Sequence, residues 1–401
     1  MSARRLAWLD ALRGFAALCV VFDHGSTLLL EPVRDFLYHG LDLGEYGVFV
    51  FFLVSGYIVP ASLERKGNIR SFWISRAFRL YPLFALALAL AALGYYAGYG
   101  TLYGAEHHPG ASLSSWLLML PNVLDGTNVP NVVWTLSYEM VFYLVLTALF
   151  SWNQHRRSGT YAVVCATGAL ALGGILPMAL FTNWANGAGH GALVLNVTAD
   201  ALILSGVGFA LSGRKWLVRA GASVAALTVL LLALLNQGYP YPWSCFQILA
   251  LMFTGTLIYR AEQSQVSWRR AGSIAGYVLA ATLAAGLWYG YGNGAQWRWQ
   301  WATSLAGAAI TFGLGLLARN RQIPNVLAWL GLVSYSVYLL HPLVYDAYRD
   351  IKPLHHPHSI PVQIGLFAVL VVVILAVSSA SYYGVEKPMQ KLGRRVAKKW
   401  A

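Results

Sequence analysis

The 401-residue sequence predicts an all-α protein, a polytopic transmembrane helix bundle of about 10–12 spans with almost nothing left over for a soluble domain. The composition is one reason, because 58% of the residues are hydrophobic, only 11% are charged and the mean hydropathy is +0.55. Soluble domains carry about 25% charged residues. The second reason is the recurrence of apolar runs of about 20 residues, the length that a helix needs to cross a bilayer.

Short polar breaks separate twelve such runs along the chain. We expect spanning helices at residues 6–29, 45–61, 77–99, 131–151, 160–181, 192–211, 216–235, 244–260, 272–290, 300–318, 325–345 and 361–384. The first run is not a cleavable signal peptide, since Asp10 and Arg13 interrupt it and no small-residue cleavage site follows. The stretch Trp116–Leu120 is too short to span and is expected to form an interfacial or re-entrant helix. We treat residues 1–401 as a single integral-membrane domain with no fused soluble domain.

The distribution of Lys and Arg predicts the orientation of these helices. If the N-terminus is cytoplasmic, 24 of the 28 Lys and Arg residues lie in cytoplasmic segments or at adjoining helix ends. We therefore expect both termini to be cytoplasmic and the protein to be a multi-pass protein of the cell (inner) membrane. This topology and the attraction of anionic lipid headgroups are sufficient to explain the net charge of +13, so no nucleic-acid partner is expected. The three cysteines show no paired spacing, and no metal site is predicted.

Ionisable residues inside the first predicted helix are the strongest indication of a functional site, because they are costly in a membrane. Arg13 and His24 are eleven residues apart, which is close to three helical turns, so they share one face about 16 Å apart along the axis. Asp10 lies one turn before Arg13 on nearly the same face. These residues are expected to line a cleft, with Asp10 holding Arg13. The alternative is that Arg13 extends to the headgroups and that His24 is an ordinary polar residue near the outer edge.

With further motifs, this pattern resembles the integral-membrane acyltransferases of the acyltransferase-3 family, which O-acylate carbohydrates and glycosylated metabolites. The family's mark is Arg or Lys, ten residues, then His in the first helix, as in Arg13 and His24. Five further motifs follow in the family's order: Phe51-Phe52-Leu53-Val54-Ser55-Gly56-Tyr57, Arg76-Ala77-Phe78-Arg79-Leu80-Tyr81-Pro82, Trp134-Thr135-Leu136-Ser137-Tyr138-Glu139, Tyr335-Ser336-Val337-Tyr338-Leu339-Leu340-His341-Pro342 and Glu386-Lys387-Pro388. Ten or eleven helices are commoner in that family than twelve.

The resemblance implies transfer of an acyl group, an acetyl group above all, from cytoplasmic acyl-CoA to a carbohydrate hydroxyl. The near-neutral pKa of an imidazole suits His24 to the role of general base, and an acyl-enzyme on its ring is the less favoured route. Arg76 and Arg79, three residues apart at the inner mouth of the third helix, are the predicted ligands of the coenzyme A phosphates, although anchoring by the positive-inside rule also explains them. Arg13 is expected to orient the donor or to stabilise the oxyanion. Acyl-CoA is a substrate here, and no permanently bound cofactor is predicted.

Five more residues are expected to line the substrate cavity: Ser55, Tyr57, Trp134, Glu139 and His341. For Glu139, an equal alternative is a structural role as the partner of an Arg or His. For His341, an equal alternative is a hydrogen bond that serves helix packing. Asp23, next to His24, points about 100° away in a regular helix and cannot orient that imidazole directly.

Twelve helices with both termini in the cytoplasm are also the topology of many secondary transporters. Transport is therefore the alternative function. The loop at residues 64–70 lacks the Gly-x-x-x-Asp-Arg-x-Gly-Arg run of major facilitator transporters, and the two halves show no similarity. The sequence leaves the acceptor open: a surface polysaccharide, a lipid-linked glycan, the sugar of a metabolite, or a separate acyl-accepting protein. The side of the membrane on which transfer takes place is equally open.

Overall fold

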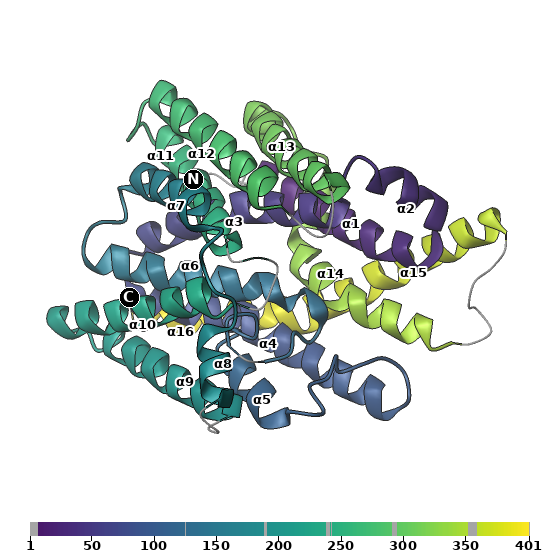
Figure 1. The fold of residues 1–401 in the computed structure, drawn as a ribbon, viewed down its shortest axis with the longest axis horizontal. Coiled ribbons are helices and arrows are strands. Elements are labelled where there is room, and N and C mark those ends of the chain that lie inside the picture. The colour runs from purple at the N-terminus through teal and green to yellow at the C-terminus, as the bar shows by residue number, and fades with distance from the viewer. Residues whose placement is uncertain are drawn as a thin grey trace. The chain divides into compact units, whose positions relative to one another are not determined.

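The computed structural model describes residues 7–124, 126–187, 191–237, 241, 243–290, 295–351 and 359–400, and every regular element in these ranges is helical (Figure 1). Eleven of the described helices are long and apolar enough to cross a membrane, which confirms the predicted polytopic helical class. The contacts group into two compact units. The first unit comprises residues 1–54, 75–102 and 290–396, and the second comprises residues 55–74, 103–289 and 397–401.

The helices of unit 1 come from both ends of the chain. They are α1 (Ala7–Leu29), α2 (Glu31–Tyr38), the start of α3 (Leu43–Lys66), most of α4 (Ile69–Tyr96), α13 (Ala295–Leu317), the 3₁₀ turn η3 (Ala318–Asn320), α14 (Asn325–Arg349), α15 (Ile360–Ser381), the π-helical segment η5 (Tyr382–Glu386) and α16 (Lys387–Lys398).

The helices of unit 2 come mainly from the middle of the chain. They are the end of α3, the start of α4, α5 (Pro109–Leu117), the 3₁₀ turn η2 (Asn131–Val133), α6 (Trp134–Ser151), α7 (Ser158–Leu172), α8 (Leu180–Gly187), α9 (Gly191–Ala210), α10 (Lys215–Leu235), α11 (Ser244–Glu262) and α12 (Trp268–Tyr289).

Several predicted boundaries were wrong, including the end of α3 at Lys66 and the start of α13 at Ala295. The fifth span, expected at 160–181, ends at Leu172 because two glycines and Pro177 follow it. The third span begins at Ile69 rather than at residue 77, because the mixed polar and apolar residues that precede the apolar run are also helical. The stretch Trp116–Leu120 is helical only at its start, where α5 ends at Leu117, and Met119 adopts a left-handed φ of 55°.

Close packing of α1 against α14 forms the centre of unit 1. A Cβ atom on Gly14 would lie 2.6 Å from Leu330 Cβ, and one on Gly331 would overlap the backbone of Asp10. Small residues of this kind allow membrane helices to approach at backbone distance. The Tyr345 hydroxyl adds a hydrogen bond of 2.9 Å to the carbonyl oxygen of Val21. Contacts advance together along both helices, so α1 and α14 are parallel.

Parallel packing also bears on the number of spans. It requires an even number of crossings between the start of α1 and the start of α14, and the long described helices before α14 provide nine. The short apolar helix α7 has 15 residues and is therefore about 22 Å long. We infer that α7 completes the even number, which a locally thinned bilayer allows.

Around α1 and α14, unit 1 also brings in α4, η5 and α16. The Tyr335 hydroxyl on α14 donates to the carbonyl oxygen of Leu80 on α4 at 3.0 Å, and the Ser336 hydroxyl donates to Glu386 Oε2 at 3.0 Å. Gly393 of α16 lies against the ring of Phe78, where a Cβ atom would clash with it. The Arg79 region of α4 is therefore held beside α14 and the end of the chain.

In unit 2, α3 packs closely against α11 through the glycine of the Ser-Gly motif. A Cβ atom on Gly56 would overlap the carbonyl group of Met252, and the Thr256 hydroxyl donates to the carbonyl oxygen of Gly56 at 2.8 Å. Near the end of α3, the fully buried Arg260 side chain forms an ion pair with Glu64 and a 2.9 Å hydrogen bond to the carbonyl oxygen of His155. These contacts bind α3, α11 and the α6–α7 connection together.

Candidate active site

Two histidines that are 317 positions apart in the sequence meet in unit 1. His24 Nδ1 on α1 lies 3.0 Å from His341 Nε2 on α14, and the ring centroids are 5.0 Å apart. His341 is fully buried and His24 is partly exposed. The glycine contact accounts for this meeting, because Gly14 and Gly331 lie ten residues before His24 and His341 on two parallel helices. Equal steps along both helices bring the imidazoles to the same level.

The hydrogen bonds of this pair determine which nitrogens carry protons. His341 Nδ1 lies 3.1 Å from the carbonyl oxygen of Val337, which can only accept, so Nδ1 carries the proton in a neutral His341 ring. His341 Nε2 is then an acceptor, and His24 Nδ1 must donate to it. This leaves the Nε2 lone pair of His24 as the proton acceptor of a neutral pair, which is the state that a general base requires.

Pro342 changes the hydrogen bonding of the helix backbone next to His341. Proline has no N–H, so the carbonyl group of Tyr338, four residues earlier, lacks its helical donor. The His341 ring interacts with the backbones of both Val337 and Tyr338. The His-Pro pair therefore anchors the imidazole to its own helix and holds the ring toward α1.

Asp23 follows the direction expected for a regular helix and does not approach the imidazole as its orienting partner. Its carboxylate accepts a hydrogen bond from the Gly44 backbone and interacts electrostatically with Asp42. Asp42 lies in the connection before α3, and burial raises the pKa of its carboxyl group. His341, rather than Asp23, is therefore the residue that orients His24.

A balanced group of four charges lies three turns from the histidine pair, at the other end of α1. The guanidinium groups of Arg13 and Arg79 both interact electrostatically with the carboxylates of Asp10 and Glu386. Glu386 also accepts hydrogen bonds from Ser336 and, at 2.9 Å, from Gln390 Nε2. The group joins α1, α4, α14 and η5. The expected pairing of Asp10 with Arg13 is thus part of a larger cluster, in which Glu386 was missed as a site residue although its motif was recognised.

The two arginines of the Arg-x-x-Arg motif were predicted to lie at the mouth of their helix, but the structure places them inside it. Because α4 begins at Ile69, Arg76 and Arg79 lie two and nearly three turns inside it. Arg76 is buried, with a relative exposure of 6%, and Arg79 is partly buried. Arg79 shares its charge with the carboxylates of Asp10 and Glu386.

The remaining predicted cavity residues lie in unit 2. The Ser55 hydroxyl lies 3.5 Å from Glu139 Oε1, and the Tyr143 hydroxyl donates to the same oxygen at 2.5 Å. The described partners of Glu139 are therefore hydroxyls. Tyr57 donates to Glu262. The Trp134 ring packs edge-on against Tyr138, with 6.2 Å between the centroids.

No group of three or more His, Cys, Asp or Glu residues able to hold a metal ion occurs in the part of the chain that the structure describes. His355, His356 and His358, which we interpreted as loop residues, lie outside the described residues.

Comparison with known proteins gives this geometry its chemical context. Residues 6–382 match the family model described as an acyltransferase domain. The chain belongs to the acyltransferase-3 family. The match includes the histidine pair, the arginine motif and Glu139, and it ends just before Glu386. The eleven apolar helices make this member a multi-pass membrane protein.

Curated relatives carry related names. Acyltransferase MdmB of Streptomyces mycarofaciens is 34% identical over 149 residues, which are 35% of this chain and 38% of that protein. Nodulation protein 10 of Rhizobium leguminosarum bv. viciae is 30% identical over 39% of this chain and 48% of its own length, and exopolysaccharide production protein ExoZ of Rhizobium meliloti is 32% identical over 32% and 43%. The chain thus spans less than half the length of each relative. No solved structure matches the chain significantly.

Proposed function

We propose that this acyltransferase-3 member transfers an acyl group, most simply an acetyl group, from cytoplasmic acyl-CoA to a hydroxyl of a carbohydrate. The histidine pair is the observation that carries the proposal, because it leaves the Nε2 lone pair of His24 as a proton acceptor. The proposed setting is the inner membrane, with both termini cytoplasmic. Acceptors compatible with the chemistry are a surface polysaccharide, a lipid-linked glycan and the sugar of a glycosylated metabolite. The name of the relative ExoZ, exopolysaccharide production protein, supports a carbohydrate acceptor.

The reaction needs one base and one route for the proton. His24 Nε2 takes the proton from the acceptor hydroxyl while the oxygen attacks the thioester carbonyl carbon. The tetrahedral intermediate collapses, the carbon–sulfur bond breaks, and the coenzyme A thiolate takes the proton back from the imidazolium. During the charged step, His24 Nδ1–H continues to donate to His341 Nε2, which stabilises the imidazolium. Arg13 lies three turns away on the same helix, which suits it to the donor better than to the oxyanion.

We propose that Arg76 and Arg79 bind the coenzyme A phosphates. Arg79 must be shared between a phosphate and the carboxylates of Asp10 and Glu386. In Arg76→Ala, KM for acyl-CoA should rise while kcat with saturating donor changes little. An unchanged KM in the Arg76→Ala/Arg79→Ala variant would exclude the phosphate role.

The test of the function is transfer from radiolabelled acetyl-CoA to a panel of glycans by purified protein. Wild type should label a glycan, His24→Ala should lose about 10²- to 10⁴-fold of the rate, and His107→Ala should keep it. His107 is a matched control because its exposed side chain lies outside the site and pairs with Glu106 at 3.6 Å. Normal transfer by folded His24→Ala would exclude His24 as the base. If wild type neither binds nor consumes acyl-CoA, the transporter alternative becomes the better function.

A further inference from the structure

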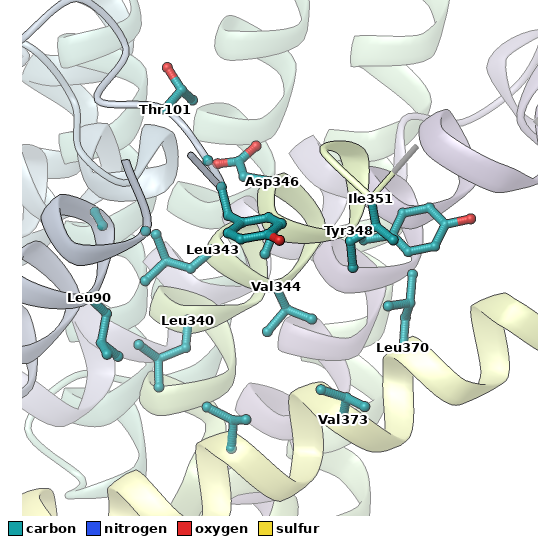
Figure 2. Close-up of a pocket in the computed structure, with 16 residues that line it drawn as sticks. Leu90, Thr101, Leu340, Leu343, Val344, Asp346, Tyr348, Ile351, Leu370 and Val373 are labelled. Carbon is teal, nitrogen blue, oxygen red and sulfur yellow. The ribbon is translucent and has the colours of Figure 1, made fainter. Parts of the chain in front are cut away.

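The last membrane span, α15, is exposed over most of its surface. One side of it faces α14 across an apolar cavity of about 470 Å³, to which Val373 contributes from α15 and Leu340, the residue before His341, from α14 (Figure 2). Away from the cavity, the Val372 side chain is 65% exposed. Among the described candidate spans, the one that contains α15 is the most apolar and the least buried. Membrane lipid is therefore the main neighbour of this helix.

Helix α16 continues the span into the headgroup layer. The 22 residues of α15 are about 33 Å long, which matches a hydrocarbon core of about 30 Å. The segment η5 and then α16 follow α15 without a break. In η5 the exposed ring of Tyr383 lies beneath the Lys387 ammonium group, 4.9 Å from it, and an aromatic ring of this kind is typical of the membrane interface. The start of α16 thus lies at the level of the lipid phosphates, on the cytoplasmic side in the predicted orientation.

One side of α16 is a continuous row of cations. Residues 387–401 contain six Lys and Arg residues and no Asp or Glu. Four of them, Lys387, Lys391, Arg394 and Arg395, fall within an arc of about 100° over about 12 Å of the helix axis. All four are exposed, and none of the ion pairs in the part of the chain that the structure describes involves them. We call these four residues the basic stripe.

The protein holds the other side of α16, so the direction of the basic stripe is fixed. Gly393 lies against the Phe78 ring of α4, where a Cβ atom would clash, and Gln390 Nε2 donates to Glu386 at 2.9 Å. The basic stripe therefore faces away from α4. Leu392 borders it and is 43% exposed. Cations beside an exposed apolar side chain are the pattern of helices that lie at a membrane surface.

We propose that the basic stripe binds the headgroups of anionic phospholipids in the leaflet where α15 ends. The lipid around α15 presents phosphates at the depth of the basic stripe, and guanidinium groups bind phosphate oxygens in pairs. Leu392 then reaches the acyl boundary beside them. Acyl-CoA is the less suitable occupant, because the basic stripe faces away from the helix that carries Arg76 and Arg79.

Photolabelling that compares an anionic with a zwitterionic lipid tests the site without any acyl transfer. Purified protein in phosphatidylcholine nanodiscs receives a trace of phosphatidylglycerol or of phosphatidylcholine, each with a diazirine at the start of one acyl chain, and the labelled peptides are identified. Peptides of α16 should take more label from phosphatidylglycerol. In Arg394→Gln/Arg395→Gln this preference should fall by up to about fivefold for each residue replaced, and in wild type it should weaken as salt is added.

Two matched variants separate the basic stripe from net charge. Arg269→Gln/Arg270→Gln removes an exposed arginine pair from the start of α12 and should leave the preference at α16 unchanged. Lys387→Arg/Lys391→Arg keeps the charge and should retain it. An equal loss in the α12 variant would overturn the stripe as a site. Equal labelling of wild-type α16 by both lipids would overturn the lipid as its ligand, and a raised KM for acyl-CoA in Arg394→Gln/Arg395→Gln would then assign the stripe to a soluble polyphosphate. If that variant does not fold, the salt dependence of wild type still decides.

Discussion

Replacement of His341 by alanine is the perturbation that most directly tests the histidine pair. It removes the acceptor that lies 3.0 Å from His24 Nδ1 and leaves the backbone and the other His24 nitrogen in place. His24 Nδ1–H then loses this partner, and both the tautomer and the orientation of the ring are released. We expect slower chemistry with little change in KM for either substrate, because the lost interaction strengthens as His24 becomes charged.

The size of the effect follows from the hydrogen bond that is lost. An unsatisfied buried donor costs about 1–3 kcal/mol, and about 1.4 kcal/mol corresponds to a factor of ten in rate. The reduction in kcat should therefore be roughly 5- to 150-fold. Removal of the base itself in His24→Ala should cost about 10²- to 10⁴-fold. Because His341 acts through His24, the double variant should be no slower than His24→Ala alone.

The assay is steady-state acetyl transfer by the single and double variants, with thermal unfolding of each protein measured in parallel. His341→Gln serves as the rescue, since its amide oxygen can accept from His24 Nδ1–H and should restore part of kcat. Tyr345→Phe is the packing control. It removes the 2.9 Å hydrogen bond to the carbonyl oxygen of Val21 between the same helices and should cost about 0.5–1.5 kcal/mol of stability with near-normal kcat.

Two results would refute the reasoning. If the double variant loses the product of the two single losses, the histidines act independently and the pair is not a unit. If His341→Ala and Tyr345→Phe lose equal activity in proportion to their loss of stability, His341 serves helix packing alone, which is the alternative that the sequence left open.

Three further predictions concern packing and charge. Gly331→Ala should strongly reduce both thermal stability and transfer, because its Cβ atom would overlap the Asp10 backbone and separate α1 from α14; normal stability would exclude the close contact. Arg260→Ala should cost about 1–3 kcal/mol in unfolding experiments, because it removes the buried partner of the Glu64 carboxylate and of the His155 carbonyl oxygen, whereas the exposed Arg269→Ala should cost less than about 0.5 kcal/mol. Arg79→Ala should lower the melting temperature, and adding Glu386→Gln should recover part of the loss; a further decrease in the double variant would argue against the charge group.

The helical class could be predicted from the sequence, and so could the position of Arg13 and His24 on one face of a single helix. The length of each apolar run and the basic residues beside it predict a membrane span from local sequence alone. The spacing of Arg13 and His24 depends only on the geometry of one helix. The boundaries of the helices were less predictable. Glycine and proline end α7 early, and α4 begins several residues before its apolar run. Glu386 was undervalued because its partners come from α4 and α14, which are distant in sequence.

The sequence by itself determined that this is a polytopic helical membrane protein with the motifs of one enzyme family, since both properties are written in local composition and order. Only the tertiary structure decided that His24 and His341 form a pair, that Arg79 shares its charge with two carboxylates, and that an apolar cavity lies beside His341. The physical reason is the approach of α1 and α14 at Gly14 and Gly331. That contact sets the register of two parallel helices, and no single segment of the chain contains this information.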